Sequence, residues 1–206
     1  MFTNMVSYQE VIIVFSKRQQ QIIETAIKLI AEKGIQNLTI KNISKEIGIT
    51  EPALYRHFDN KLEILKGIIQ YFSIIMKPAF ESMQKENQPI QQIENFFFSH
   101  LRILNNNYNF AKVIFSESNF QNDETLINSI NIMMNKSQQK IKSVILQGQA
   151  INEIHSEQNA LNISRIIIGS LRFLVIQWTM SGMVFDLEGE GLQLWNDIKK
   201  LIVNTN

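Results

Sequence analysis

Hydrophobic residues recur with the spacing of helices along most of the chain. Over residues 17–33 apolar side chains fall three and four positions apart, as on one face of a helix, and Gly34 ends the run. Similar periods cover residues 59–87, 89–104, 110–118, 123–150, 158–181 and 192–203. No segment alternates convincingly between apolar and polar residues. With two short helices between residues 38 and 58, the pattern predicts an all-α protein of about nine helices.

The segment 38–65 predicts two short helices joined by a tight turn. Thr39 and Thr50 stand where a hydroxyl can cap each helix, and Pro52 falls in the first turn of the second helix. Gly48 lies between them, where a left-handed turn costs other residues most. Two short helices around such a turn form a helix-turn-helix, whose second helix can enter the major groove of DNA.

The apolar positions of this segment define one inward and one outward face. Isoleucines of the first helix would pack on Leu54 and Phe58, which lie four residues apart on the second. A solvated helix in some other small helical domain fits the same spacing, because this geometry also occurs in proteins that do not bind DNA. Side chains on or beside the outward face can contact base edges or phosphates. They are Thr39, Thr50, Glu51, Pro52, Ala53, Tyr55, Arg56, His57 and Lys61.

The run from Arg18 to Leu65, about a quarter of the chain, resembles the DNA-binding domain of TetR-family transcriptional regulators. The most specific part is the block Leu54-Tyr55-Arg56-His57-Phe58 with Lys61. The resemblance implies a homodimer on a palindromic operator in double-stranded DNA, acting as a repressor that a small molecule releases. Glu51 and Pro52 depart from the residues common in relatives, which leaves the base preference open.

Roles on the outward face follow from geometry and from the resemblance. Glu51 could accept a hydrogen bond from a cytosine amino group, and Ala53 could touch a thymine methyl. Arg56 faces either bases or a phosphate, and His57 either holds a phosphate or packs. The residues assigned to phosphates are Thr39, Thr50, Tyr55 and Lys61.

Charge and composition add to this picture. The net charge of the 206 residues is only +1, but residues 17–66 hold nine Lys and Arg against six Asp and Glu, whereas residues 67–206 hold eleven against twelve. The positive excess therefore coincides with the predicted DNA-binding segment. The absence of cysteine excludes disulfides and thiolate metal sites and fits a cytoplasmic protein.

These patterns divide the chain into three parts. Residues 1–16 predict a poorly ordered extension, because their apolar run is too short for a signal peptide and no Lys or Arg precedes it. Residues 17–65 predict the helix-turn-helix domain, and residues 66–206 a helical regulatory and dimerisation domain. Asp59 is placed to cap the long helix between them, which should kink or break at Pro78.

The apolar segment 158–181 could pack against a second copy of the chain. Arg165 and Arg172 interrupt it, so it offers no stretch of roughly twenty uncharged apolar residues, and we predict no membrane span. With the last helix it could form half of a four-helix bundle across a two-fold axis, although an ordinary core helix also fits. The resemblance implies the dimer, for which the candidates are Ile166, Gly169, Ser170, Phe173, Leu194 and Ile198.

The middle helices are rich in Phe, Met and Ile, and the resemblance implies that a pocket between them binds an effector. An ordinary core fits the aromatic stripes as well, and a satisfied core histidine fits His100. The scarcity of paired charges favours an apolar or cationic-aromatic effector. The candidate lining residues are Phe97, His100, Phe115, Met133 and Trp178.

The sequence indicates no catalytic, metal or cofactor site. His57, His100 and His155 are far apart, and no Ser/His/Asp order, carboxylate pair or glycine-rich phosphate loop is present. We therefore expect a regulator rather than an enzyme, with no cofactor. Two alternatives stay open: a TetR-like DNA-binding protein that acts through protein partners without a ligand, as in nucleoid occlusion, and a helical interaction module with no DNA role.

Overall fold

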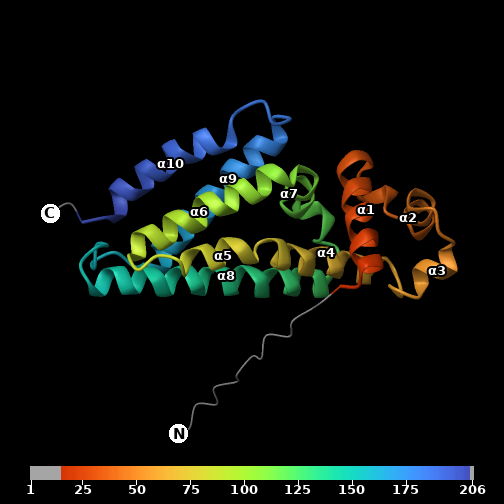
Figure 1. Ribbon diagram of the computed structural model, residues 1–206, viewed down its shortest axis with the longest axis horizontal. Coiled ribbons are helices and arrows are strands. Elements are labelled where there is room, and N and C mark those ends of the chain that lie inside the picture. Colours follow the sequence, from red (N-terminus) through yellow and green to blue (C-terminus); the bar gives the residue numbers. More distant parts are fainter. Residues whose placement is uncertain (1–14, 205–206) are drawn as a thin grey trace, which may run out of the picture.

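The computed structural model describes residues 15–204, which fold into helices joined by short connections (Figure 1). The predicted extension 1–16 lies almost entirely outside that range. Within it, the only β pairing is an isolated bridge between Ile154 and Val203, so the all-α class is confirmed. The helices are α1 (Lys17–Lys33), α2 (Ile40–Ile47), α3 (Glu51–Tyr55), α4 (Lys61–Ile75), α5 (Lys77–Met83), α6 (Pro89–Asn106), α7 (Tyr108–Ile114), α8 (Glu124–Ala150), α9 (Ala160–Met180) and α10 (Leu187–Ile202), with 3-10 turns η1 (Ile35–Asn37) and η2 (Glu117–Asn119).

Helices α1, α2 and α3 form a small unit at one end of the molecule (Figure 1). The Thr39 hydroxyl accepts a hydrogen bond from the Asn42 N–H at 3.1 Å, and the Thr50 hydroxyl accepts one from the Ala53 N–H at 3.4 Å. Gly48 has φ 78° and ψ 36°, a left-handed conformation that a β-carbon disfavours. The predicted caps and turn of the helix-turn-helix are therefore confirmed.

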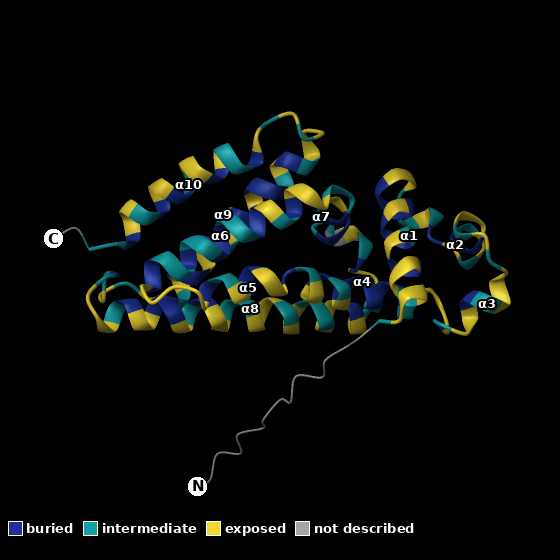
Figure 2. Ribbon diagram, viewed as in Figure 1, coloured by how far each residue is buried: buried dark blue, intermediate teal, exposed yellow. Residues whose placement is uncertain are grey.

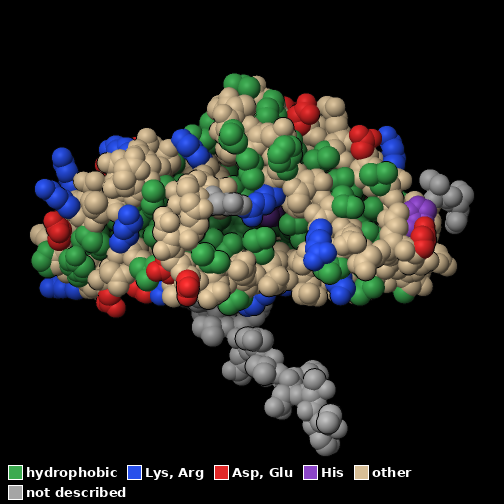
Figure 3. Space-filling model, turned by 180° about the vertical axis from the view of Figure 1, so that it is seen from behind, with side chains coloured by type: hydrophobic (Ala, Val, Ile, Leu, Met, Phe, Trp, Pro, Cys, Tyr) green, Lys and Arg blue, Asp and Glu red, His purple; other side chains and the backbone are tan. Residues whose placement is uncertain are grey.

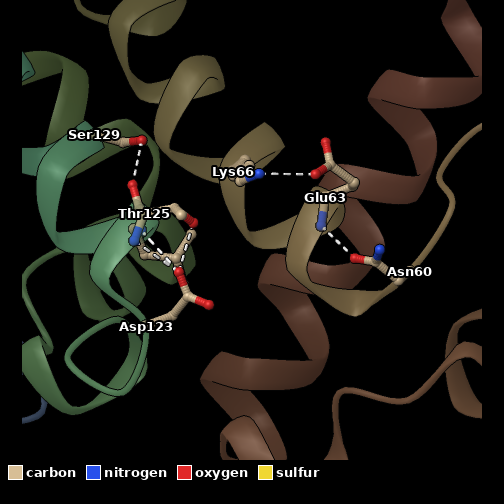
Figure 4. Close-up of polar contacts among 7 residues, drawn as sticks. Asn60, Glu63, Lys66, Asp123, Thr125 and Ser129 are labelled. Atoms are coloured by element: carbon tan, nitrogen blue, oxygen red, sulfur yellow. Dashed lines mark hydrogen bonds and ion pairs between the residues drawn. The ribbon is translucent and has the colours of Figure 1, made fainter.

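The predicted long helix from residue 59 is two helices, α4 and α5, which meet at Met76; Pro78 lies in the first turn of α5. The prediction of a break is confirmed, but the predicted cap is wrong. Asn60 rather than Asp59 caps α4, because its Oδ1 accepts a hydrogen bond from the Glu63 N–H at 3.0 Å (Figure 4).

Helix α8 begins beside α4 (Figure 4). Asp123 caps it by accepting hydrogen bonds from the backbone N–H groups of Thr125 and Leu126, at 2.8 and 3.2 Å. The hydrogen bond from the Thr125 hydroxyl is the largest of several effects that lower the pKa of Asp123. This cap fixes the start of α8 next to the helix that leads out of the small unit.

The last helix begins five residues earlier than predicted, at Leu187. Gly189 and Gly191 both lie inside α10. A β-carbon at position 191 would lie 2.2 Å from Leu101 Cδ1, so this glycine allows α10 to approach α6 closely. The glycine here permits packing rather than a turn.

Helices α4 to α10 form the larger unit, whose buried side chains make a continuous apolar core with that of the small unit (Figure 2). In it α5 packs on α6, α8 on α9, and α10 on α6 and α9. Helices α4 and α7 connect the two units, because both pack against α1. Among the described residues α9 is long and apolar enough to cross a membrane by length and composition alone, yet it packs on α6, α7, α8 and α10.

Candidate functional site

The predicted DNA-binding residues lie at the N-terminal cap of α2, on and directly beside α3, and at the start of α4. Leu54 of α3 is fully buried, whereas Glu51, Pro52, Tyr55 and the following Arg56 are exposed. Thr39, Thr50 and Lys61 are also exposed, whereas Ala53 and His57 are half-buried. Leu54 and Phe58 are thus the inward side chains that the sequence indicated, whereas Ala53 and His57 are less exposed than the outward face predicted.

Three of the groups predicted to bind phosphate also have partners within the protein. Lys61 Nζ donates to the Ile35 carbonyl at 3.1 Å in an exposed hydrogen bond. The hydroxyls of Thr39 and Thr50 accept from backbone N–H groups, and each keeps its own hydrogen to donate. Exchanging one exposed bond for a phosphate contact costs little, since such a bond contributes only about 1 kcal/mol net.

An ion pair joins α1 to α2 in the same unit. Lys28 Nζ lies 2.8 Å from Glu46 Oε1, and this hydrogen bond raises the pKa of Lys28 and lowers that of Glu46. Both side chains are exposed to solvent, so the pair adds little stability. The pair lies beside the packing of α2 on α1, in which Ile43 is fully buried.

A cavity of about 400 Å³ lies between α4, α6, α7, α8 and α9. In the view of Figure 3, hydrophobic side chains surround a hollow in the middle of the molecule. Polar groups enter the lining from His100, Gln121, Asn131, Ser137 and Arg172. The rest is apolar and includes Phe72, Phe96, Phe115, Phe120, Ile130 and Met133.

His100 lies in the wall of this cavity between two aromatic rings. Its ring centre is 6.2 Å from that of Phe72 and 5.4 Å from that of Phe96. The side chain is buried, and its Nδ1 has no hydrogen-bond partner among the described residues. Burial lowers the pKa of His100 to about 4, so the imidazole is neutral near pH 7.

Arg172 places a positive charge at the side of the cavity. Its guanidinium lies 5.6 Å from the ring centre of Phe115, and one of its nitrogens is 3.8 Å from the sulfur of Met134. The residue therefore links α9 to α8 and to the end of α7.

His100, Phe115 and Met133, three of the five predicted ligand residues, line the cavity, but Phe97 and Trp178 do not. The ring of Phe97 lies 5.4 Å from that of Trp195 on α10, and Trp178 packs edge-to-face on Tyr108. We therefore remove these two from the predicted site. Sequence reasoning missed Phe72, Phe96, Phe120 and Arg172.

The predicted dimer face lies on the outer side of α9 and α10. Ile166 and Phe173 are 48% and 61% exposed, and no atom lies within 4 Å of a β-carbon built on Gly169. Ser170 and Leu194 line a shallow hollow between the two helices. Ile198 is only 4% exposed and packs inside the subunit, so its assignment to the interface is wrong.

No group of three or more His, Asp and Glu residues in the described part of the chain could hold a metal ion. Of the histidines that the sequence singled out, His155 Nδ1 lies 3.3 Å from Glu157 Oε1, and His57 and His100 lie on different units.

A helix-turn-helix joined to a helical unit with an internal cavity is the architecture of a DNA-binding regulator of transcription. Residues 22–68 match the family model described as bacterial regulatory proteins, tetR family, and residues 68–205 match the YsiA-like protein, C-terminal region. The chain belongs to the tetR family of bacterial regulatory proteins, whose members regulate transcription by binding DNA.

Two curated relatives match to different extents. The nucleoid occlusion factor SlmA of Haemophilus influenzae is 27% identical over 100 residues, which are 48% of this chain and 46% of that protein. The chain thus spans about half the length of that relative. The fatty acid metabolism regulator protein of Bacillus subtilis is 25% identical over 188 residues, 91% of this chain and 94% of that protein.

Solved structures support the fold. FadR, the fatty acid degradation regulator of Bacillus halodurans, has a TM-score of 0.82 at 18% identity, over 91% of this chain and 97% of that one. FadR of Bacillus subtilis in complex with stearoyl-CoA has a TM-score of 0.79 at 21% identity, over 87% and 96%. At these identities the likeness is one of fold alone.

Proposed function

We propose that the protein is a cytoplasmic homodimer that binds a palindromic operator through α3 and is released from it by an effector in the cavity. The observation that carries the proposal is the outer face of α3, where Glu51, Tyr55 and Arg56 are exposed while Leu54 anchors the helix. In this proposal residues 17–65 bind DNA, residues 66–206 bind the effector and dimerise, and the chemistry is binding without catalysis. Release requires that the effector bind the DNA-incompetent state more tightly.

The proposed DNA contacts divide into two groups. Glu51, Ala53 and Arg56 face base edges, and Arg56 is suited to a bidentate contact with guanine. Phosphates are held by the hydroxyls and the ammonium group of Thr39, Thr50, Tyr55 and Lys61, with Pro52 and His57 beside them. Two such heads related by a two-fold axis would meet half-sites about 34–36 Å apart.

Selection of binding sites from a random DNA library, together with the DNA upstream of its own gene, tests this proposal. We expect an inverted repeat, and we expect Arg56→Ala to lower operator affinity by about 5- to 150-fold and relax one base position of each half-site. Lys85→Ala is the control, because this exposed lysine lies in the connection between α5 and α6. A folded dimer that prefers no sequence at about physiological salt, where non-specific binding is weak, would overturn the proposal.

We further propose that the effector is a long-chain acyl-CoA or a similar amphiphile. The apolar lining around Phe72, Phe96 and Met133 suits an alkyl chain. The full-length similarity to a fatty acid metabolism regulator supports the same class of ligand.

Gel-shift titration of the operator complex with stearoyl-CoA, free CoA and triclosan tests the effector class. We expect stearoyl-CoA to dissociate the complex and free CoA to leave it intact, because the alkyl chain supplies most of the apolar burial. Ile130→Trp, which narrows the cavity, should raise the stearoyl-CoA concentration that dissociates half of the complex, when each protein is titrated at the same multiple of its own Kd for the operator. Triclosan serves as an aromatic probe, so release by triclosan but not by stearoyl-CoA would favour an aromatic effector. If neither stearoyl-CoA nor triclosan releases the operator, the acyl-CoA proposal is contradicted.

A second candidate function follows from the similarity to nucleoid occlusion factors, which covers about half of this chain. In that case the protein would act through protein partners while bound to DNA, and no effector would be needed. Mapping its sites on the chromosome separates the two functions. Many dispersed sites whose occupancy no acyl-CoA changes would favour the second, whereas one or a few promoter sites would favour the first.

A further inference from the structure

Helix α1 packs against α4 and α7 of the larger unit, and polar contacts near each end of α1 accompany this packing. The Ala31 carbonyl, in the last turn of α1, accepts a hydrogen bond from Lys112 Nζ of α7 at 2.7 Å. A helix leaves its last carbonyls without intrahelical partners, and the helix dipole favours a cation there. Nearer the start of α1, Glu24 Oε1 accepts a hydrogen bond from the Tyr71 hydroxyl of α4 at 2.6 Å.

The two helices that make these contacts also form walls of the cavity. Ile114 lines it from α7, two residues after Lys112, and Phe72 lines it from α4, directly after Tyr71. Phe72 stacks on Phe110 of α7, with ring centres 5.4 Å apart. A change in the cavity that displaces α4 or α7 therefore acts on the helices that hold α1.

Helix α1 is in turn connected to the helices of the DNA-binding surface. Gly34 ends α1, and η1 follows, where the Ile35 carbonyl accepts the hydrogen bond from Lys61 at the start of α4. The pair of Lys28 and Glu46 joins α1 to α2. A change in the direction of α1 would therefore carry α2 and α3 with it.

We propose that Lys112 is a positioning residue that couples the cavity to the DNA-binding unit, because it fixes the C-terminal end of α1 to α7. The inference concerns the same cavity and surface as the proposed function. Its test needs neither an operator nor an effector, so the two can fail independently.

Hydrogen exchange of residues 32–60 provides the test, with the cavity filled by mutation instead of by a ligand. Ser137→Phe and Asn131→Phe each place an aromatic ring into the cavity from α8. In the wild-type background we expect each substitution to change exchange in residues 32–60 by about threefold or more, since local openings report the packing of the segment. In a Lys112→Met background, which keeps an apolar stem and removes the ammonium, we expect most of that response to be lost.

Two controls separate coupling from a merely structural role. Lys112→Arg keeps a donor and should keep the response, and Lys85→Met makes the same charge change far from α1. If Lys112 only stabilises the end of α1, Lys112→Met will raise exchange there and leave the response to cavity filling intact. That outcome overturns the proposal, and so does a folded Ser137→Phe or Asn131→Phe protein with unchanged exchange in residues 32–60.

Discussion

Lys61 and Tyr55 are both predicted to hold phosphates, but only one of them carries a charge. A lysine that neutralises a phosphate releases a counterion from the DNA. Replacing that lysine therefore lowers the slope of the logarithm of the binding constant against the logarithm of the salt concentration by about one in magnitude. We expect Lys61→Met to show this change and to weaken binding to all sequences. Tyr55→Phe should also weaken binding generally while leaving the slope unchanged. Fluorescence anisotropy between 50 and 300 mM salt, roughly the range in which such slopes are measured, gives both quantities.

A slope that Lys61→Met leaves unchanged would contradict the phosphate contact. In that case Lys61 would keep its exposed hydrogen bond to the Ile35 carbonyl when the protein binds DNA.

His100 should make the folded protein sensitive to mild acid. Its pKa is about 4 in the folded protein and 6.5 in its unperturbed state. Below pH 6.5 the unfolded chain binds the proton more readily, so stability is lost as the pH falls from about 6.5 towards 4. With one pKa unit equal to 1.36 kcal/mol, the loss is about 3 kcal/mol at pH 4. Urea unfolding of wild type and His100→Leu across this range measures it.

Carboxylates titrate in the same range, so the difference between the two proteins is the relevant quantity. If wild type and His100→Leu lose stability in parallel between pH 6.5 and 4, the imidazole is not the neutral buried group described above.

At the scale of elements, helical periodicity located most helices because the core lies on one side of each. It could not determine how each helix is rotated against its neighbours. Phe96 and Phe97 differ by about 100° around α6, so one faces the cavity and the other faces Trp195 of α10. The wrong assignments of Phe97, Trp178 and Ile198 share this cause. The cavity is also lined by helices that are far apart in the sequence, so the spacing of residues along one helix cannot predict its extent.

Glycines were equally ambiguous, because a turn and a close helix contact both require one. Gly48 forms a turn. Gly148 instead lies inside α8, where it permits other segments to approach the helix closely. A β-carbon there would lie 2.7 Å from Ile154 Cδ1 and 3.2 Å from Pro89 Cβ. We expect Gly148→Ala to destabilise the protein by about 1–3 kcal/mol, as overpacked cores do. Chemical denaturation measures the change.

A double-mutant cycle with Ile154→Ala identifies the cause of that loss. Removing most of the Ile154 side chain should reduce the cost of Gly148→Ala by more than about 0.5 kcal/mol, because contacting residues are not additive. Additive costs would place the strain elsewhere.

At the scale of the whole molecule, the two units have different roles but share helices. The helix-turn-helix was predictable from the sequence because its caps, glycine turn and faces are local. The contact of Lys112 with the Ala31 carbonyl joins residues 81 positions apart, and the cavity is lined by residues from Phe72 to Arg172. No local pattern indicates either feature. The regulatory part of the molecule is therefore the part that needed the structure.

The outer face of α9 and α10 is the surface on which a dimer would depend. Phe173 is 61% exposed on this face, with Ile166 and Met180 also exposed on α9 and Leu201 on α10. Large apolar side chains gathered on one face are typical of an interface in a member of a dimeric family. We expect Phe173→Glu to give a folded monomer by sedimentation at micromolar concentration, because each copy would bury a charge against the other.

Ile132→Glu is the matched control, since Ile132 is 58% exposed on α8, outside this face. It should stay dimeric and keep its operator affinity. The Phe173→Glu monomer should lose operator affinity by more than about tenfold, because one head contacts only one half-site. If Ile132→Glu dissociates while Phe173→Glu does not, the dimer forms through α8 instead. The spacing of the two heads, and with it the expected operator, would then have to be derived from that face.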